Sequence, residues 1–173
     1  TNSGGPPAGH FEDFSSEDWQ NAINLSFTSH INLIRQALPF LKKSKSPSVL
    51  AITSFTIKNP LDNLILSNSI RTATAALIKS LTFEYGKNGI RFNSILPGWT
   101  NTDRVKNLIK IKAESAGKTS EEIADGISSS IPLGRIGLPE EFARTAAFLV
   151  SPAASYINDV MLAVDGGITK SLL

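Results

Sequence analysis

The 173-residue sequence predicts an α/β fold, a doubly wound parallel sheet with helices on both faces. Three observations predict this class. Helical patterns longer than about ten residues alternate with short apolar runs along the chain. The runs are continuously apolar rather than alternating, which is typical of strands buried on both faces. Turn residues follow each run, at the edge where parallel sheets bind ligands.

Composition limits the function before any motif is considered. The chain is 41% hydrophobic, enough for one domain with its own core, and it has no cysteine. Disulfides, thiolate metal sites and a cysteine nucleophile are therefore excluded, and no metal site is expected. The net charge of +2 comes from scattered basic residues, and no apolar stretch approaches the roughly 20 residues of a membrane span. We expect a cytoplasmic protein without nucleic-acid or membrane partners.

The first elements follow from local signals. Three glycines and two prolines make residues 1–9 a loop. Ser15 and Asp18 have the spacing of a capping box and predict the start of one long amphipathic helix, which ends between Pro39 and Lys45. Its apolar residues recur at spacings of three and four, namely Trp19, Ile23, Phe27, Ile31, Ile34 and Leu38.

The middle of the chain predicts a strand, a helix and a second strand. Residues 48–53 (SVLAIT) form a short apolar run, and a loop with Pro60 follows. Residues 67–85 predict a helix that Gly86 and the Asn88-Gly89 turn would end. Residues 90–96 (IRFNSIL) predict the next strand, stopped by Pro97-Gly98.

The last third predicts a lid, a helix and a strand. Residues 102–131 are polar with helical propensity and are interrupted by Gly117 and Gly126, so we expect short helices that form a mobile lid over a binding site. A helix begins at Pro139 and ends near Val150. Residues 160–164 predict a strand that leads into Asp165-Gly166-Gly167, and ligands are expected at the loops after Thr53 and Leu96 and at the Gly-rich segment of Asn2.

Five segments together resemble the short-chain dehydrogenase/reductase family over nearly the whole chain. They are Asn2-Ser3-Gly4, Asn24 in WQNAINLSF, Ser54 after SVLAIT, NSILPGWTNT over residues 93–102, and a C-terminal series of residues 132–137, PEE, SPAASYI and VDGG. The C-terminal series is most similar to the branch with 3-oxoacyl-acyl-carrier-protein reductases. The resemblance implies a Rossmann-like fold in one domain over residues 1–173, and hydride transfer between NAD or NADP and a small carbonyl or hydroxyl compound.

The chain departs from this family in two places. The family's Gly-rich pyrophosphate turn, TGxxxGxG, has no counterpart here, so the N-terminal half of the domain is absent from the chain. We expect cofactor binding only if the natural protein continues upstream of Thr1. The family's YxxxK has become SNSIR, which puts Ser67 at the tyrosine position and Arg71 at the lysine position.

The resemblance implies catalytic and cofactor-binding roles for residues of this atypical site. The implied catalytic residues are Asn24, Ser54, Ser67 and Arg71. The implied cofactor-binding residues are Asn2, Gly4, Arg71, Pro97, Gly98, Thr100 and Thr102. Ser67 and Arg71 share a helix face, but a serine hydroxyl is a far weaker acid than tyrosine. The planar fork of Arg71 beside two serines suits a carboxylate or phosphate, so an anionic acyl or acid substrate is one hypothesis.

Other features leave alternatives open. His10 lies near the expected site and could donate a proton, or it is a solvated loop residue. Tyr85 and Tyr156 are interpreted as packing residues. Loss of the tyrosine acid supports an alternative interpretation. In it, the protein is a catalytically impaired homologue that acts as a ligand-binding or structural subunit. The resemblance also implies a homodimer or homotetramer through the helices beginning near Ser15 and Ser67.

Overall fold

The computed structural model describes residues 1–172 and contains a three-stranded parallel sheet. The strands are β1 (Ser48–Ile52), β2 (Arg91–Pro97) and β3 (Met161–Val164), in the order β1-β2-β3. Ala51 pairs with Ser94, and Ser94 in turn pairs with Met161. The predicted α/β class with a parallel sheet is confirmed, and the three predicted strands differ from the observed ones by single residues at their ends.

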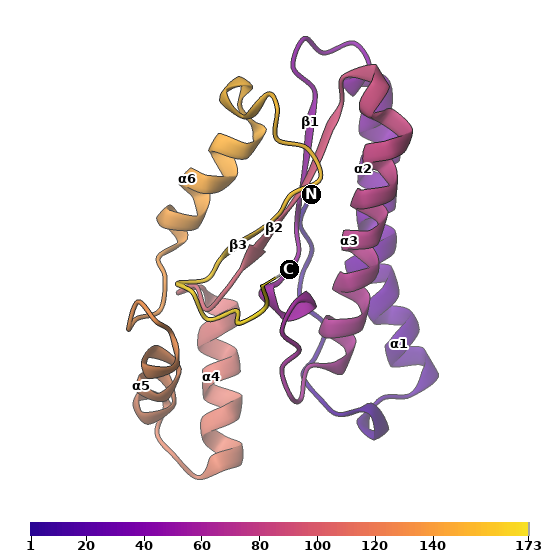
Figure 1. Ribbon diagram of the computed structural model, residues 1–173. Helices are drawn as coiled ribbons and strands as arrows, with labels where there is room; N and C mark the ends of the chain where they lie inside the picture. Colours follow the sequence, from indigo (N-terminus) through magenta and orange to yellow (C-terminus); the bar gives the residue numbers. More distant parts are fainter. Residues whose placement is uncertain (173) are drawn as a thin grey trace.

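Helices cover both faces of this sheet (Figure 1). One face carries α1 (Ser16–Ile23), α2 (Ser29–Leu41) and α3 (Ile65–Tyr85), and the other carries α6 (Pro139–Val150). Val49 and Ala51 pack with Ile78 of α3, whereas Leu50 packs with Leu149 of α6. Successive strand residues point to opposite faces, so a strand covered on both sides is apolar throughout.

The helical segment after residue 15 is continuous but not uniform. Ser15 and Asp18 form the predicted capping box. Between α1 and α2, residues Asn24–Thr28 make one π-helical turn, in which the N–H of Ser29 donates to the carbonyl of Asn24. Thr74 of α3 donates its hydroxyl to the carbonyl of Ser26, so the neighbouring helix satisfies a backbone group there. Among the described residues, no helix is both long and apolar enough to cross a bilayer.

The segment predicted as a lid forms two helices. They are α4 (Asp103–Ala116) and α5 (Ser120–Ser130), which pack on each other below the sheet in Figure 1. Gly117 ends α4 in the left-handed conformation, with a φ of 62°, as predicted. The break predicted at Gly126 is wrong, because this residue lies inside α5. Packing of its neighbours Ile123 and Ile127 against α4 offsets the roughly 1 kcal/mol that a helical glycine costs.

The first residues run along the outer edge of β1. The N–H of Ile52 donates to the carbonyl of Thr1 over 2.9 Å, and the amino group of Thr1 donates to the carbonyl of Leu50 over 2.5 Å. Thr1 thus extends the parallel pairing at this edge. The segment after Thr1 therefore leaves the sheet at the same end as the loops that follow β1 and β2.

Candidate active site

Three loops meet at the carboxyl ends of the strands and enclose a cavity of about 600 Å³. They are residues 2–5 at the outer edge of β1, residues 53–56 after β1, and residues 97–102 after β2. The cavity lies at the edge of the sheet predicted from the sequence. Parallel strands present their carboxyl ends together, which is why three segments distant in sequence converge here.

The wall of the cavity is mostly apolar. Its larger apolar side chains are Phe55, Leu61, Leu64, Trp99, Val105, Leu108 and Phe142. Val105 and Leu108 belong to α4, so the first helix of the segment predicted as a lid lines the cavity. Residues of α5 do not line it. Whether the segment moves remains a prediction.

Arg71 holds two of the three loops together. Its Nη1 donates to the carbonyls of Ile52 and Thr53 over 3.3 and 3.0 Å, and its Nη2 lies 3.5 Å from the carbonyl of Gly4. Burial lowers the pKa of this guanidinium, and the positive charge of Arg104 lowers it further. Arg71 lies on α3 one helical turn after Ser67, and both line the cavity as the spacing predicts.

Ser54 and Ser67 present two hydroxyl groups to the cavity. The Oγ of Ser54 accepts hydrogen bonds from the N–H of Thr56 over 3.2 Å and from its hydroxyl over 3.0 Å. Since Ser54 accepts twice, its own proton is available for an acceptor in the cavity. Ser67 is only 8% exposed and lines the same cavity, where its hydroxyl can turn toward a ligand. Both residues can therefore donate to a ligand oxygen.

Asn24 lies apart from these groups. Its side chain is exposed and accepts a hydrogen bond from Gln20, and it is not part of the cavity wall. This corrects the placement beside the substrate that the resemblance implied. The π turn brings Ser26 inward instead, and the hydroxyl of Ser26, fully buried, donates to the carbonyl of Gly4. The sequence analysis missed Ser26, although a small polar residue on the apolar side of this helix was a signal.

The residues expected to hold the cofactor all line the cavity, namely Asn2, Gly4, Arg71, Pro97, Gly98, Thr100 and Thr102. Thr53, in the same wall, has a buried hydroxyl without a partner among the described residues. Such an unsatisfied group is one that a polar ligand can satisfy. These hydroxyl and backbone groups therefore fit an amide-bearing ring with a ribose.

Gly98 fixes the turn after β2. A Cβ atom on this residue would lie 2.5 Å from the Cβ of Asp165 and 2.6 Å from its Cα. The turns after β2 and β3 thus pack backbone to backbone, which explains why glycine follows Pro97. The packing places Trp99 and Thr100 at the cavity.

Arg104 is a further residue of the site that the sequence patterns did not indicate. Its Nη2 donates to the carbonyl of Pro6 over 2.7 Å, and burial lowers the pKa of its guanidinium. It is the second residue of α4, where a cation opposes the helix dipole. A positive charge in the first turn of a helix is unfavourable, and this was the feature of the sequence that could have pointed to a special role for Arg104.

Two other sequence interpretations are corrected or limited by the structure. His10 is exposed and outside the cavity wall. Tyr85 packs against the core as predicted, but Tyr156 is fully exposed and is not a packing residue. Neither tyrosine lines the cavity, so the polar side chains of its wall that can donate to a substrate oxygen include Ser54, Ser67 and Arg71.

Comparison with known proteins was made over the same chain. Residues 1–169 match the family model described as enoyl-(acyl carrier protein) reductase. The chain is 32% identical over 157 residues to a chloroplastic tropinone reductase homologue of Arabidopsis thaliana, and 31% identical over 160 residues to a 7alpha-hydroxysteroid dehydrogenase of Escherichia coli. These matches cover 91% and 92% of this chain but 46% and 59% of the relatives, so the chain spans about half their length.

A solved structure shares the fold of this chain. An NADPH-bound short-chain oxidoreductase of Pseudomonas aeruginosa, described as containing an atypical catalytic centre, superposes with a TM-score of 0.86 at 27% identity. The match covers 98% of this chain and 64% of that structure. The three loops around the cavity therefore occupy a fold that binds NADPH in that protein.

Proposed function

Because the chain belongs to the short-chain dehydrogenase/reductase family, we propose that the whole protein is an NAD(P)-dependent oxidoreductase that acts on a small carbonyl or hydroxyl compound. One observation carries the proposal. Arg71 joins the loop after β1 to the segment of Gly4, and the hydroxyls of Ser54 and Ser67 line the same cavity. Asn2, Gly4, Arg71, Pro97, Gly98, Thr100 and Thr102 would hold the cofactor.

A bound nicotinamide supplies or accepts the hydride in this chemistry. Ser54 donates its hydroxyl proton as a hydrogen bond to the carbonyl oxygen of the substrate, since its lone pairs are already engaged by Thr56. Arg71 stabilises the alkoxide that develops there, because its charge is held in a largely apolar cavity. Arg71 keeps its proton, so the proton is relayed from water through the hydroxyl of Ser67.

The experiment titrates the whole protein with NADPH and NADH and follows reduction of small ketones. Arg71→Leu should lower kcat/KM by about 100-fold, because the variant removes the charge beside the developing alkoxide. Lys79→Leu, eight residues further along the same helix and exposed, is the matched control. Absence of binding of either nucleotide to the whole protein would refute the oxidoreductase proposal.

A second pair of substitutions tests the altered proton delivery. Ser67→Tyr combined with Arg71→Lys restores the family's acid and cation at the same spacing. The double variant should be more active than the unmodified protein and show a new basic limb in its pH profile. An equal rate and profile would mean that proton delivery through Ser67 is not what limits the reaction.

The oligomer stays a proposal that the surface supports. Leu33 and Phe40 of α2 and Phe83 of α3 are exposed by 50%, 75% and 75%. Apolar side chains on two adjacent helices are typical of a surface that pairs with a second copy. Phe83→Asp should therefore convert a homodimer or homotetramer into a smaller species in light scattering. A monomeric unmodified protein would contradict the assembly.

A further inference from the structure

Two guanidinium groups converge on one short stretch of the cavity wall. Arg71 reaches the carbonyl of Gly4, and Arg104 donates to the carbonyl of Pro6. Between these contacts, a Cβ atom on Gly5 would lie only 2.9 Å from the Nε and Nη2 of Arg104. Within residues 4–6, Gly4 thus contacts Arg71 while Gly5 and Pro6 contact Arg104. The positive charge of Arg104 is close enough to lower the pKa of Arg71.

Neither cation is neutralised. Among residues 1–172, no aspartate or glutamate lines the cavity. The ion pairs within these residues are formed by Lys79, Lys106 and Arg135, and none involves Arg71 or Arg104. Arg71 and Arg104 meet only backbone carbonyls. Each guanidinium has five N–H donors, so several remain for a ligand. Arg71 is partly exposed and Arg104 is exposed, and both line the same cavity, where their like charges repel each other. An anion bound between them would relieve this repulsion.

We propose that the Arg71–Arg104 pair binds an anionic group of the substrate, a carboxylate or phosphate, so that the enzyme acts on an oxo or hydroxy acid rather than on a neutral ketone. The inference rests on the proposed oxidoreductase function and names its substrate class. Arg71 also interacts with the reacting carbonyl of the substrate. Arg104 is therefore the residue that discriminates between an acid and a neutral ketone. Leu61, Leu64 and Leu108 contact the apolar body of the acid.

The position of Arg104 favours the substrate over the cofactor as the source of the anion. Arg104, Val105 and Leu108 come from α4, whereas the expected cofactor residues other than Arg71 come from the loops at the strand ends. A residue on the helix that lines the apolar part of the cavity is placed to recognise what enters there. A paired guanidinium binds a carboxylate through two parallel hydrogen bonds, which a neutral ester cannot reproduce.

The test compares acids with their methyl esters on the whole protein. Isothermal titration calorimetry measures binding of pyruvate, acetoacetate and levulinate, their methyl esters, and inorganic phosphate. NADPH-dependent rates are measured for the same ketones. At least one acid should exceed its ester by roughly 10- to 100-fold in affinity and in kcat/KM, the usual effect of charge-assisted hydrogen bonds. Arg104→Gln should remove this preference.

Lys106→Gln is the matched control, since it removes a positive charge from α4 that is paired with Asp103 outside the cavity wall. It should keep the preference for the acid. If no acid exceeds its ester and phosphate does not bind, the inference is overturned. It is also overturned if Arg104→Gln weakens NADPH binding but leaves the acid preference intact, since the anion would then be the cofactor's phosphate. Arg104-dependent acid binding without any NADPH binding would keep the anion-binding role of the Arg71–Arg104 pair and refute the proposed oxidoreductase.

Discussion

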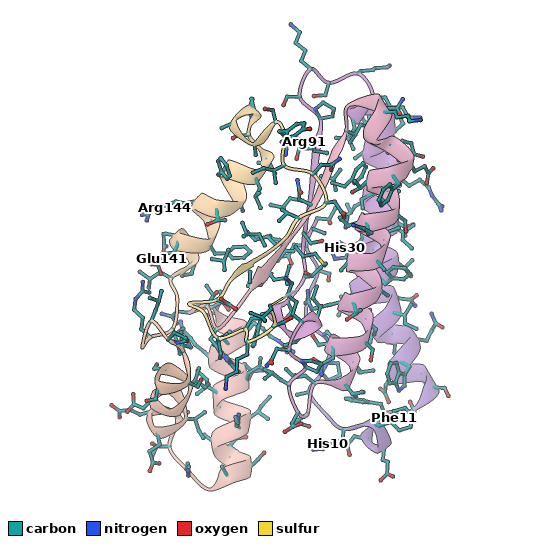
Figure 2. All side chains as sticks on the ribbon, viewed as in Figure 1. His10, Phe11, His30, Arg91, Glu141 and Arg144 are labelled. Carbon is teal, nitrogen blue, oxygen red and sulfur yellow. The ribbon has the colours of Figure 1, made fainter. Side chains whose placement is uncertain are left out.

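Arginines lie at both ends of β2, a buried one at its start and two beside the cavity at its other end, but their hydrogen bonding differs. At the start of the strand, Arg91 donates to the carbonyls of Leu149, Ile157 and Ser151 over 2.9 to 3.2 Å. Figure 2 shows Arg91 at the upper end of the sheet, between the strands and the end of α6. Beyond the other end, Arg71 and Arg104 share a cavity and retain free donors.

The difference separates a structural arginine from a binding one. Arg91 supplies donors to carbonyls at the end of α6, which have no partner within their own helix. Its surroundings are complete without a ligand. At the opposite end of the sheet, Arg71 and Arg104 have more N–H donors than the carbonyls they contact can accept, and a cavity lies beside them. Arg91 is buried, whereas Arg71 is partly exposed and Arg104 is exposed. All three carry a positive charge, so it is the unused hydrogen-bonding capacity beside a cavity that marks the binding end.

The largest expected effect comes from Arg91→Met. The substitution keeps much of the apolar volume but leaves the carbonyls of Leu149 and Ser151 without their donor, whereas the carbonyl of Ile157 still accepts from Asn93, so the free energy of unfolding should fall by about 3 kcal/mol. Urea denaturation of the whole protein measures this loss. Ligand affinity of the folded fraction should stay unchanged, in contrast to Arg104→Gln.

Arg144→Met is the control for Arg91→Met, since Arg144 is exposed on α6 (Figure 2). Its free energy of unfolding should change by less than about 0.5 kcal/mol. Equal losses in the two variants would show that the carbonyl contacts of Arg91 contribute nothing and would remove the distinction between the two ends.

A smaller effect is expected at the cavity end from Gly98→Ala. The new methyl group would lie against the Cα and Cβ of Asp165, where backbone must move, so the free energy of unfolding should fall by about 2 to 3 kcal/mol. Gly126→Ala is the matched control, because it lies in a helix with open space around it and should stabilise by up to about 1 kcal/mol. Circular dichroism during thermal unfolding compares them, and a stable Gly98→Ala would mean that the two turns are not rigidly packed.

Much of this fold was predictable because local signals and tertiary packing agree. Val49, Leu50 and Ala51 are apolar in succession, and the structure buries them on alternate faces. Ser15 caps its helix as the sequence pattern indicates. Gly126 was misjudged because a glycine weakens a helix only modestly, and contacts of α5 with α4 decide the outcome. Local propensity does not report those contacts.

The site was predictable where residues follow strand ends and less so where helices supply them. Ser54, Ser67 and Arg71 reach the cavity because the strand order and the spacing of four determine their positions. Asn24 does not, because a π turn inserts a residue and changes which side chain faces inward. Arg104 depends on where α4 packs, which no local pattern specifies.

The smallest expected effect concerns His30, a buried imidazole between the two ends of the sheet (Figure 2). Its Nδ1 lies 2.6 Å from the hydroxyl of Thr1. Burial above all, and the positive charge of Arg71 beside it, lower the pKa of His30 from 6.5 to about 4. The folded protein therefore disfavours the protonated form that the unfolded chain adopts below its ordinary pKa.

Stability should consequently be complete above the unfolded pKa of 6.5 and decline as the pH falls toward about 4. Between about pH 7.5 and about pH 5 the linkage amounts to about 2 kcal/mol in the free energy of unfolding. Urea denaturation at several pH values measures it. His30→Gln carries no titrating group, so its profile should be flatter by this amount across the same range. Parallel profiles for the two proteins would show that another group is responsible, and His30 would then join Arg91 as a purely structural residue.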